Sequence, residues 1–350
     1  MVNVGVIGLG RMGMLHLMSC LNIDGVKVVA ASDPSTKALK KARKLGVNVL
    51  YEDYRDLLSK NSEVDAVVIS LPNFLHLESV RLALEAGLHV FIEKPLAKNV
   101  EECREIVRLV EKTGKKLTVG NVLRFEEGII KMKETLNSGS IGSLEVVTLE
   151  EIINGPFSHP RNPAPVADWW FDPEKSGGGV LLDLGCHLID LFRFFVGEEC
   201  EVDFSSLEYF FNLPVEDGAI VMLRSSNSVR GIINVGWYQK TVYPQFDFNI
   251  MLHGNSGYLS INDFRPKNLY TYAVKEGTKN ILRKLTKRKI RPLSYTYHYE
   301  GFYKELVSFF DCIRNDSAPA VSAIEGMKTI ELIEQAYEYG NSKKRLASLV

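Results

Sequence analysis

The chain opens with the stretch VNVGVIGLGRMG, residues 2–13, and this stretch decides the fold. Its first half is a short apolar run typical of a buried β-strand, and its second half is the pattern Gly8-x-Gly10-x-x-Gly13 ahead of an amphipathic segment. The first glycine permits a tight turn, the second lets the backbone approach a pyrophosphate, and the third allows close packing of helix on strand. The stretch predicts a dinucleotide site whose phosphates lie at a helix N-terminus, beside Arg11 and Met12.

Asp33 strengthens this prediction, because it follows the second apolar run, twenty residues after Gly13. A carboxylate at this place receives the hydroxyls of the adenosine ribose. It also repels a 2′-phosphate, so NAD is favoured over NADP. Lys37, Lys40 and Lys41 follow closely and leave NADP open.

Short apolar runs alternate with longer amphipathic runs through the first third of the chain, as in a parallel sheet covered by helices. The expected strands are Val2–Ile7, Val26–Ser32, Val64–Ser70, Leu88–Ile92 and Lys116–Val119. The expected helices are Met12–Leu21, Ser35–Leu45, Leu75–Ala86 and Val100–Lys112. We therefore expect a Rossmann-like α/β domain over residues 1–123.

The pattern changes after about Arg124, where consecutive strand-like runs separated by turn signals indicate an antiparallel sheet. These runs are Val202–Phe211, Ala219–Ser225, Gly231–Tyr238, Asp247–His253 and Leu269–Tyr272. The expected helices are Glu126–Asn137, Val180–Val196, Tyr303–Arg314 and Ala323–Tyr339. Residues 124–350 are thus predicted to form an α+β domain with a large open, mainly antiparallel sheet.

Composition excludes several classes of protein. The 350 residues carry a formal charge of −1, which argues against a nucleic-acid binder. The five cysteines are scattered without zinc-site spacing, which favours reduced thiols and a cytoplasmic protein without a metal. No run of about 18 apolar residues predicts a membrane span, and the start of the chain does not resemble a secretory signal.

One stretch, Lys279–Arg291, holds seven basic residues and no acidic one. Such a run is usually a solvated loop or hairpin arm. A phosphate-bearing substrate, an anionic partner or a subunit contact are the alternatives.

Glu93-Lys94-Pro95 follows the expected strand Leu88–Ile92, at the edge where open α/β sheets bind their ligands. A lysine there could hydrogen-bond a substrate hydroxyl and stabilise developing negative charge. A surface ion pair between Lys94 and Glu93 explains the pattern equally well.

Three glycines, residues 177–179, precede an apolar helix that carries Asp183, His187 and Asp190. Residues four apart share a helix face, so Asp183 could fix the tautomer of His187, which would act as a base for a hydroxyl proton. A core histidine is the plainer reading, and a metal site lacks a third firm ligand.

Taken together, the glycine fingerprint, Glu93-Lys94-Pro95 and Asp183-x-x-x-His187 resemble the glucose-fructose oxidoreductase and inositol dehydrogenase family, abbreviated Gfo/Idh/MocA. The segments Ser70–His76 and Arg124-Phe125 add to the likeness, which spans nearly the whole chain. The resemblance implies an NAD(P)-dependent dehydrogenase that oxidises a ring hydroxyl of a sugar, inositol or nucleotide-linked sugar. It also implies a homodimer or homotetramer that associates through the sheet of the C-terminal domain.

The resemblance further implies roles for single residues. Lys94 corresponds to the lysine that holds the reacting hydroxyl, His187 to the catalytic acid/base and Asp183 to its carboxylate companion. The expected cofactor contacts are Gly8, Gly10, Arg11, Met12, Gly13, Asp33, Ser70, Leu71, Pro72, Asn73, His76, Glu93, Lys94, Pro95 and Asn121.

Substrate contacts are harder to transfer, because Gly120-Asn121-Val122 stands where many relatives carry histidine or an aromatic residue. Arg124 and the loop before the glycine tract offer candidates, since arginine grips anions and aromatic faces stack on sugar rings. The loop candidates are His159, Arg161, Trp169 and Trp170. The tryptophans could equally pack the domain.

Two rival functions remain at this point. One is a glycosidase or eliminase of the same family that retains NAD and uses a transient oxidation. The other is a nucleotide sensor or scaffold without turnover, against which the presence of Lys94, Asp183 and His187 argues.

Overall fold

The computed structural model describes the chain except for residues 61, 156–166, 198, 239–245, 292–295, 298 and 348–350. The chain packs as two compact units. The first contains Met1–Ala97, Glu101–Glu126 and Pro266–Gly326, and the second contains Lys98–Val100, Glu127–Arg265 and Met327–Val350. This is a grouping by packing, and the domain boundaries 1–123 and 124–350 stay predictions.

The first unit is built on a six-stranded parallel sheet in the order β3-β2-β1-β4-β5-β6. Its strands are β1 (Val2–Ile7), β2 (Val26–Ser32), β3 (Val49–Tyr51), β4 (Ala66–Ile69), β5 (His89–Glu93) and β6 (Leu117–Gly120). The strand order reverses between β1 and β4, which is where such sheets bind nucleotides. Ile7 pairs with Ser32 on one side and with Ile69 on the other, so the ends of these three strands lie level.

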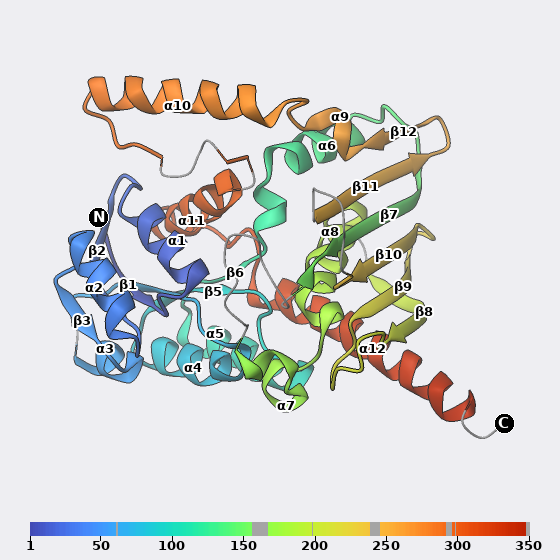
Figure 1. Ribbon diagram of the computed structural model, residues 1–350, viewed down its shortest axis with the longest axis horizontal. Helices are drawn as coiled ribbons and strands as arrows, with labels where there is room; N and C mark the ends of the chain where they lie inside the picture. Colours follow the sequence, from blue (N-terminus) through green and yellow to red (C-terminus); the bar gives the residue numbers. More distant parts are fainter. Residues whose placement is uncertain are drawn as a thin grey trace. The chain divides into compact units, whose positions relative to one another are not determined.

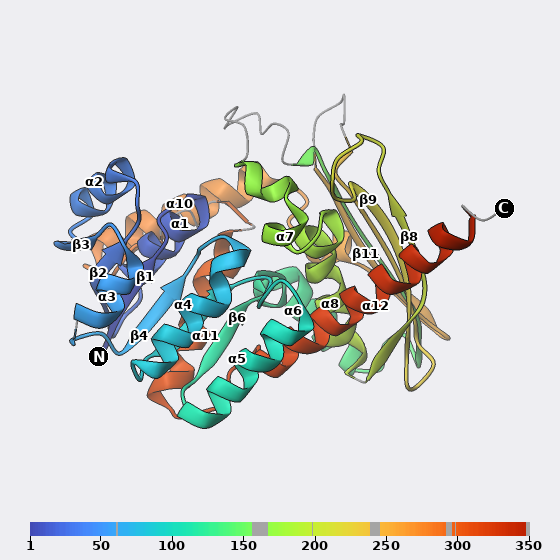
Figure 2. The same cartoon turned by 90° about the horizontal axis from the view of Figure 1, so that it is seen from below.

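Helices cover both faces of this sheet, as Figure 1 and Figure 2 show. One face is covered by α1 (Arg11–Cys20), α2 (Thr36–Lys44) and α11 (Tyr299–Arg314). The other face is covered by α3 (Tyr54–Lys60), α4 (His76–Glu85) and α5 (Val100–Thr113). The alternating pattern of the sequence predicted this Rossmann-like layering, and the structure confirms it.

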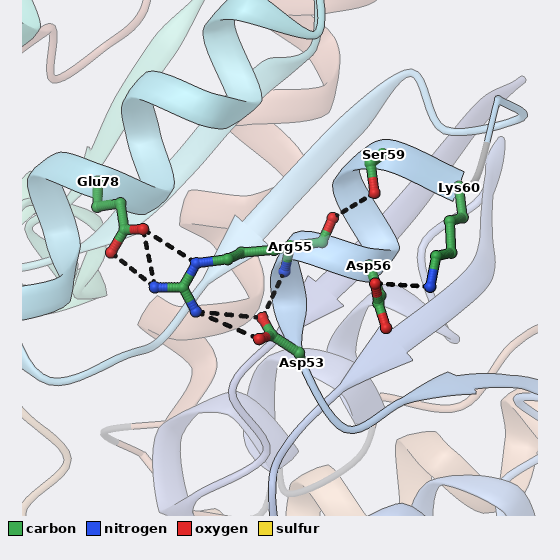
Figure 3. A network of polar contacts seen from close by, with 6 residues as sticks. All are labelled: Asp53, Arg55, Asp56, Ser59, Lys60 and Glu78. Carbon is green, nitrogen blue, oxygen red and sulfur yellow. Dashed lines mark hydrogen bonds and ion pairs between the residues drawn. The ribbon is translucent and has the colours of Figure 1, made fainter.

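On the surface of this unit, Arg55 joins α3 to α4 (Figure 3). Its guanidinium donates to both carboxylate oxygens of Glu78 and also contacts Asp53. All three side chains are about half exposed, so the network fixes local geometry and adds little stability.

The second unit contains a six-stranded mixed sheet in the order β12-β11-β7-β10-β9-β8. Only β7 and β10 run parallel, and the other neighbours are antiparallel. The strands are β7 (Leu144–Ile153), β8 (Cys200–Glu208), β9 (Gly218–Ser225), β10 (Arg230–Gly236), β11 (Phe246–Gly254) and β12 (Gly257–Ser260). The expected mainly antiparallel sheet is confirmed.

Helices line one side of this second sheet (Figure 2). The ring of Phe192 on α8 (Cys186–Val196) lies where a Cβ on Gly231 of β10 would stand, and Leu207 of β8 packs on Gly340 of α12 (Ala323–Ala347). Smaller helical elements complete the unit: α6 (Glu127–Asn137), the short turn η4 (Asp168–Phe171), α7 (Pro173–Ser176), η5 (Leu181–Gly185) and α9 (Ile261–Phe264).

The predicted strand Leu269–Tyr272 is wrong, because these residues begin helix α10 (Leu269–Leu285). The Asn268 side chain caps that helix by accepting from the backbone N–H groups of Tyr270 and Thr271, at 2.9 and 3.2 Å. The first part of the basic stretch therefore lies on a helix, and not in a loop or hairpin arm. Among the described helices, none is long and apolar enough to cross a membrane.

Candidate cofactor and catalytic site

The glycine turn connects β1 to α1 and has the close approaches that its sequence predicts. A Cβ on Gly13 would stand 1.8 Å from the carbonyl oxygen of Gly8, and a Cβ on Gly8 would stand 2.4 Å from the carbonyl oxygen of Ser70. Gly8 has a φ of +83°, a conformation that glycine adopts readily. A Cβ on Gly10 would meet nothing within 4 Å, so this backbone is open to a ligand at the start of α1. A pyrophosphate fits this arrangement.

Asp33 lies directly after β2 and braces the same turn. One carboxylate oxygen accepts the backbone N–H of Leu9 at 2.6 Å, and the other accepts the N–H of Ser35 at 2.8 Å. The side chain is half-buried at the level edge of β1, β2 and β4, so it remains accessible to a ribose. A hollow on the following helix α2 is lined by Lys37, Lys40, Lys41 and Lys44.

The segment after β4 brings Ser70 and His76 to this edge. The hydroxyl of Ser70 is buried and has no hydrogen-bond partner among the described residues, so it is free to bond a ligand there. The two ring nitrogens of His76 lie 2.8 Å from the Pro95 carbonyl and 2.9 Å from the Leu71 carbonyl. His76 is fully buried, which lowers its pKa, and its ring ties together the segments that follow β4 and β5.

Glu93 ends β5 and holds the start of the Glu93-Lys94-Pro95 segment. Its carboxylate contacts His16 Nε2 on α1 at 2.5 Å and accepts the backbone N–H of Lys94 at 3.3 Å. Lys94 itself is half-buried, and Glu93 is only 8% exposed. Glu93 therefore contacts Lys94 through the backbone of Lys94, and His16 is a side-chain partner of Glu93.

A third buried group, Glu305 on α11, completes this cluster. One ligand atom each from His16, Glu93 and Glu305 lies within 4.8 Å of the others. Burial, and then the charge of Glu93, raise the pKa of Glu305 well above its usual value, which favours the neutral form of this carboxyl. His16 and Glu93 are already hydrogen-bonded to each other, so Glu305 is the member of the cluster that has no hydrogen-bond partner among the described residues.

In the second unit, η5 is a π-helical turn that contains Asp183 and continues into α8, which carries His187. Asp183 and His187 are the only residues between Val180 and Asp190 that are not buried. Asp190 is 1% exposed and does not share their access to solvent. Single π turns in helices are frequent at functional sites.

Glu216 anchors the glycine tract that starts this helix. Its carboxylate accepts the backbone N–H of Gly179 at 3.0 Å, the N–H of Leu181 at 3.0 Å and the hydroxyl of Tyr337 at 2.7 Å. Burial raises the pKa of Glu216, while these hydrogen bonds oppose the shift. A Cβ on Gly179 would lie 2.0 Å from the Glu216 carbonyl oxygen, so the glycine is required for this approach.

The remaining site candidates are placed as follows. Arg124, in the turn η2 (Val122–Phe125), forms an ion pair with Glu325 at 3.2 Å and is nearly buried. Trp169 and Trp170 pack against each other with ring centroids 5.2 Å apart, and Trp170 lies 6.3 Å from Trp237. Asn121 is buried at the end of β6. His159 and Arg161 lie outside the described residues, and Leu71, Pro72 and Asn73 form the segment from β4 into the short helical turn η1 (Asn73–Leu75).

Reasoning from the sequence missed His16, Glu305 and Glu216. His16 stands out as a polar side chain on the mainly apolar helix α1, whereas Glu305 lies on the amphipathic helix α11 and Glu216 in the segment before β9, and neither glutamate carries a clear signal in the sequence. Their partners lie far away along the chain, as for Glu216 and Tyr337, which are 121 residues apart. Only the folded chain brings them together.

Comparisons with known proteins agree with these two units. The model of the oxidoreductase family with an NAD-binding Rossmann fold matches residues 2–121, and the model of that family's C-terminal alpha/beta domain matches residues 133–347. The myo-inositol 2-dehydrogenase of Thermotoga maritima is 28% identical over 99% of this chain and 98% of its own length. The scyllo-inositol 2-dehydrogenase (NAD(+)) of Bacillus subtilis is 26% identical over 95% and 92%.

A solved structure shares the fold. Scyllo-inositol dehydrogenase from Lactobacillus casei, with bound NAD(H) and scyllo-inositol, superposes with a TM-score of 0.78 at 22% identity. The match covers 98% of this chain and 97% of that one.

Proposed function

The chain belongs to the Gfo/Idh/MocA oxidoreductase family, and from this premise we propose that it oxidises a ring hydroxyl of an inositol or a sugar with NAD. The observation that carries the proposal is the pair Asp183 and His187, the two accessible positions in an otherwise buried helical run. The two inositol dehydrogenases that align over nearly the whole chain support a cyclic polyol as the substrate class.

NAD, when bound, accepts the hydride that leaves the carbinol carbon. The turn Gly8–Gly13 and the N-terminus of α1 would hold its pyrophosphate, and Asp33 its adenosine ribose. Ser70 Oγ offers a hydrogen bond to the same ligand. The rest of the proposed cofactor site would be shaped or supported by Leu71, Pro72, Asn73, His76, Glu93, Pro95 and Asn121. Asp33 favours NAD, while the lysines of α2 keep NADP as a weaker cofactor.

His187 takes the hydroxyl proton at a ring nitrogen, and Asp183 orients the imidazole. The Lys94 ammonium donates a hydrogen bond to the reacting oxygen and stabilises its developing negative charge. Arg124, Trp169 and Trp170 remain candidates for substrate recognition, and the ion pair of Arg124 with Glu325 limits its freedom to take that role.

The first test is accumulation of NADH from the purified protein with NAD and a panel of inositols, hexoses and nucleotide sugars. We expect NADH with a cyclic polyol. His187→Ala and Lys94→Ala should each lower turnover by about a hundredfold to ten-thousandfold, as for the loss of a proton-transfer group. His253→Ala on β11 and Lys112→Ala on α5 are the matched controls and should leave turnover unchanged.

Formation of product without net NADH would favour the alternative, an NAD-retaining glycosidase or eliminase. Turnover at the wild-type rate in His187→Ala would remove the mechanism altogether.

The cellular location and the oligomeric state of the enzyme are also proposals. A cytoplasmic location is supported by the NAD requirement and by the five cysteines, all described, none of which forms a disulfide. A homo-oligomer is supported by the face of β9 and β10 that the helices leave uncovered. There Ile220, Met222 and Ile232 are 43%, 38% and 37% exposed, while their sequence neighbours are buried. An apolar sheet face of this kind is typical of a subunit interface.

A further inference from the structure

Helix α10 presents its apolar side chains to solvent, which reverses the usual arrangement of a surface helix. Tyr270, Val274, Ile281 and Leu285 are 77%, 52%, 61% and 74% exposed. Their spacing of four, seven and four residues puts them on one stripe along the helix, the stripe 270–285. A helix in water normally turns such a stripe toward the core.

The opposite face of α10 turns toward the protein and carries polar and aromatic side chains, with the ring centroid of Tyr272 lying 5.5 Å from that of Tyr297. Glu276 is buried and forms an ion pair with Lys279, and it is the one buried residue of the helix. Asn280, four residues further along this face, donates to the Arg291 carbonyl at 2.9 Å and accepts the Arg291 N–H at 3.0 Å. These contacts fix which way the helix faces, so the outward stripe is built into the fold.

We propose that the stripe 270–285 pairs with the same stripe of a second copy of this chain, with the two α10 helices antiparallel. The stripe is symmetric about the midpoint between Gly277 and Thr278. An antiparallel partner therefore places Tyr270 opposite Leu285 and Val274 opposite Ile281, each pair twice. Gly277 and the small Thr278 meet at the centre, where a Cβ on Gly277 would find nothing within 4 Å of its own chain, so two helices can approach closely.

The charges beside the stripe permit this register. Lys275 falls opposite Asn280, and Lys284 falls opposite Thr271, so no basic side chain of the helix faces another across the pair. The net charge of each helix is still positive, and raising the salt concentration should leave the pair intact or strengthen it. An anionic lipid surface, the other occupant that a basic apolar helix suggests, would be released by salt.

The stripe 270–285 lies on the first unit, whereas the uncovered face of β9 and β10 lies on the second. A closed tetramer with dihedral symmetry needs two different self-complementary interfaces, and the chain offers two such surfaces. Only the tetramer rests on the homo-oligomer proposed above, because it also needs the contact between the sheet faces. The α10 pair itself can be tested separately from the sheet and from catalysis.

The register is tested by disulfide cross-linking of the full-length protein. The double variant Val274→Cys, Ile281→Cys should form a covalent dimer on mild oxidation, because each new thiol faces the other kind across the pair. Each single variant faces an apolar residue and should stay monomeric on a denaturing gel, as should the wild type. No covalent dimer from the double variant, or equal dimer from both single variants, would overturn the register.

Sedimentation velocity tests the assembly. We expect a tetramer for the wild type and a dimer for Ile281→Ser, Leu285→Ser and also for Met222→Ser, Ile232→Ser, with a monomer when all four changes are combined. Unchanged sedimentation of the α10 variant would contradict the proposal. So would a wild-type dimer that cosediments with vesicles containing phosphatidylglycerol and not with phosphatidylcholine vesicles.

Discussion

Glu305 is the residue whose protonation should be most visible in the stability of the protein. Its carboxyl is fully buried without a hydrogen-bond partner among the described residues, and its pKa is raised in the folded state above the ordinary value of 4.5. Above pH 4.5 the unfolded chain gives up this proton while the folded protein keeps it, so the native state binds more protons. Stability contributed by the neutral carboxyl is therefore lost as the pH rises toward the folded pKa.

Glu305→Gln removes this titration and keeps the shape of the side chain. From pH 4.5 up to the raised pKa of the folded state, the wild type should lose stability relative to the variant by up to about 1.4 kcal/mol for each pH unit. Urea unfolding at several pH values measures the difference. Parallel pH profiles of the two proteins would mean that Glu305 is ionised in the folded state.

Asp33 should set the choice of cofactor. Replacing it with serine removes the charge that opposes a 2′-phosphate and also the acceptor for the Leu9 N–H. Two like charges about 4 Å apart near a surface cost about 1 to 4 kcal/mol, so the preference for NAD over NADP should fall by about tenfold or more. The kcat/KM ratio of the two cofactors checks this. Asp56→Ser, on exposed α3, is the control and should keep the wild-type ratio.

Among single residues, the type and spacing of Gly8, Asp33 and His187 were enough to predict a role in cofactor binding or proton transfer. The sequence could not identify the buried carboxyls Glu216 and Glu305. Their burial depends on tertiary structure, and a glutamate on an amphipathic helix, such as Glu305 on α11, is ordinarily exposed.

Among the elements, the start of the π turn at Leu181 should be sensitive to a small change in the glycine tract before it. Gly179→Ala would push a methyl group into the Glu216 carbonyl oxygen and displace the helix that carries Asp183 and His187. Overpacking of this kind costs about 1 to 3 kcal/mol. We expect a lower Tm together with a loss of turnover larger than the unfolded fraction explains. Gly257→Ala, whose Cβ would make ordinary contacts, should change neither quantity.

The elements of the first unit were predictable because strands buried on both faces and amphipathic helices differ clearly in their periodicity. The prediction of a strand at Leu269–Tyr272 failed because a run of four residues is too short to distinguish a strand from a helix. The side chain of Asn268 caps these residues as the start of a helix. The π turn was equally out of reach, since its sequence reads as ordinary helix.

Across the whole molecule, both the proposed cofactor site and the proposed catalytic helix adjoin clusters of buried polar side chains. In the first unit, the backbone of Lys94 contacts Glu93, which lies in a cluster with His16 and Glu305. In the second unit, Glu216 binds Tyr337 and the backbone that leads into the helix of Asp183 and His187. The central claim is that these two supported sites serve one hydride transfer from a polyol carbon to NAD.

Deuterium transfer tests that claim most directly. The protein is incubated with NAD and with inositols and glucose that carry deuterium on every ring carbon, and the cofactor is analysed by mass spectrometry. We predict NADH with one deuterium from the wild type and none from His187→Ala. Conversion of the deuterated compound while the cofactor stays oxidised and unlabelled would contradict the dehydrogenase.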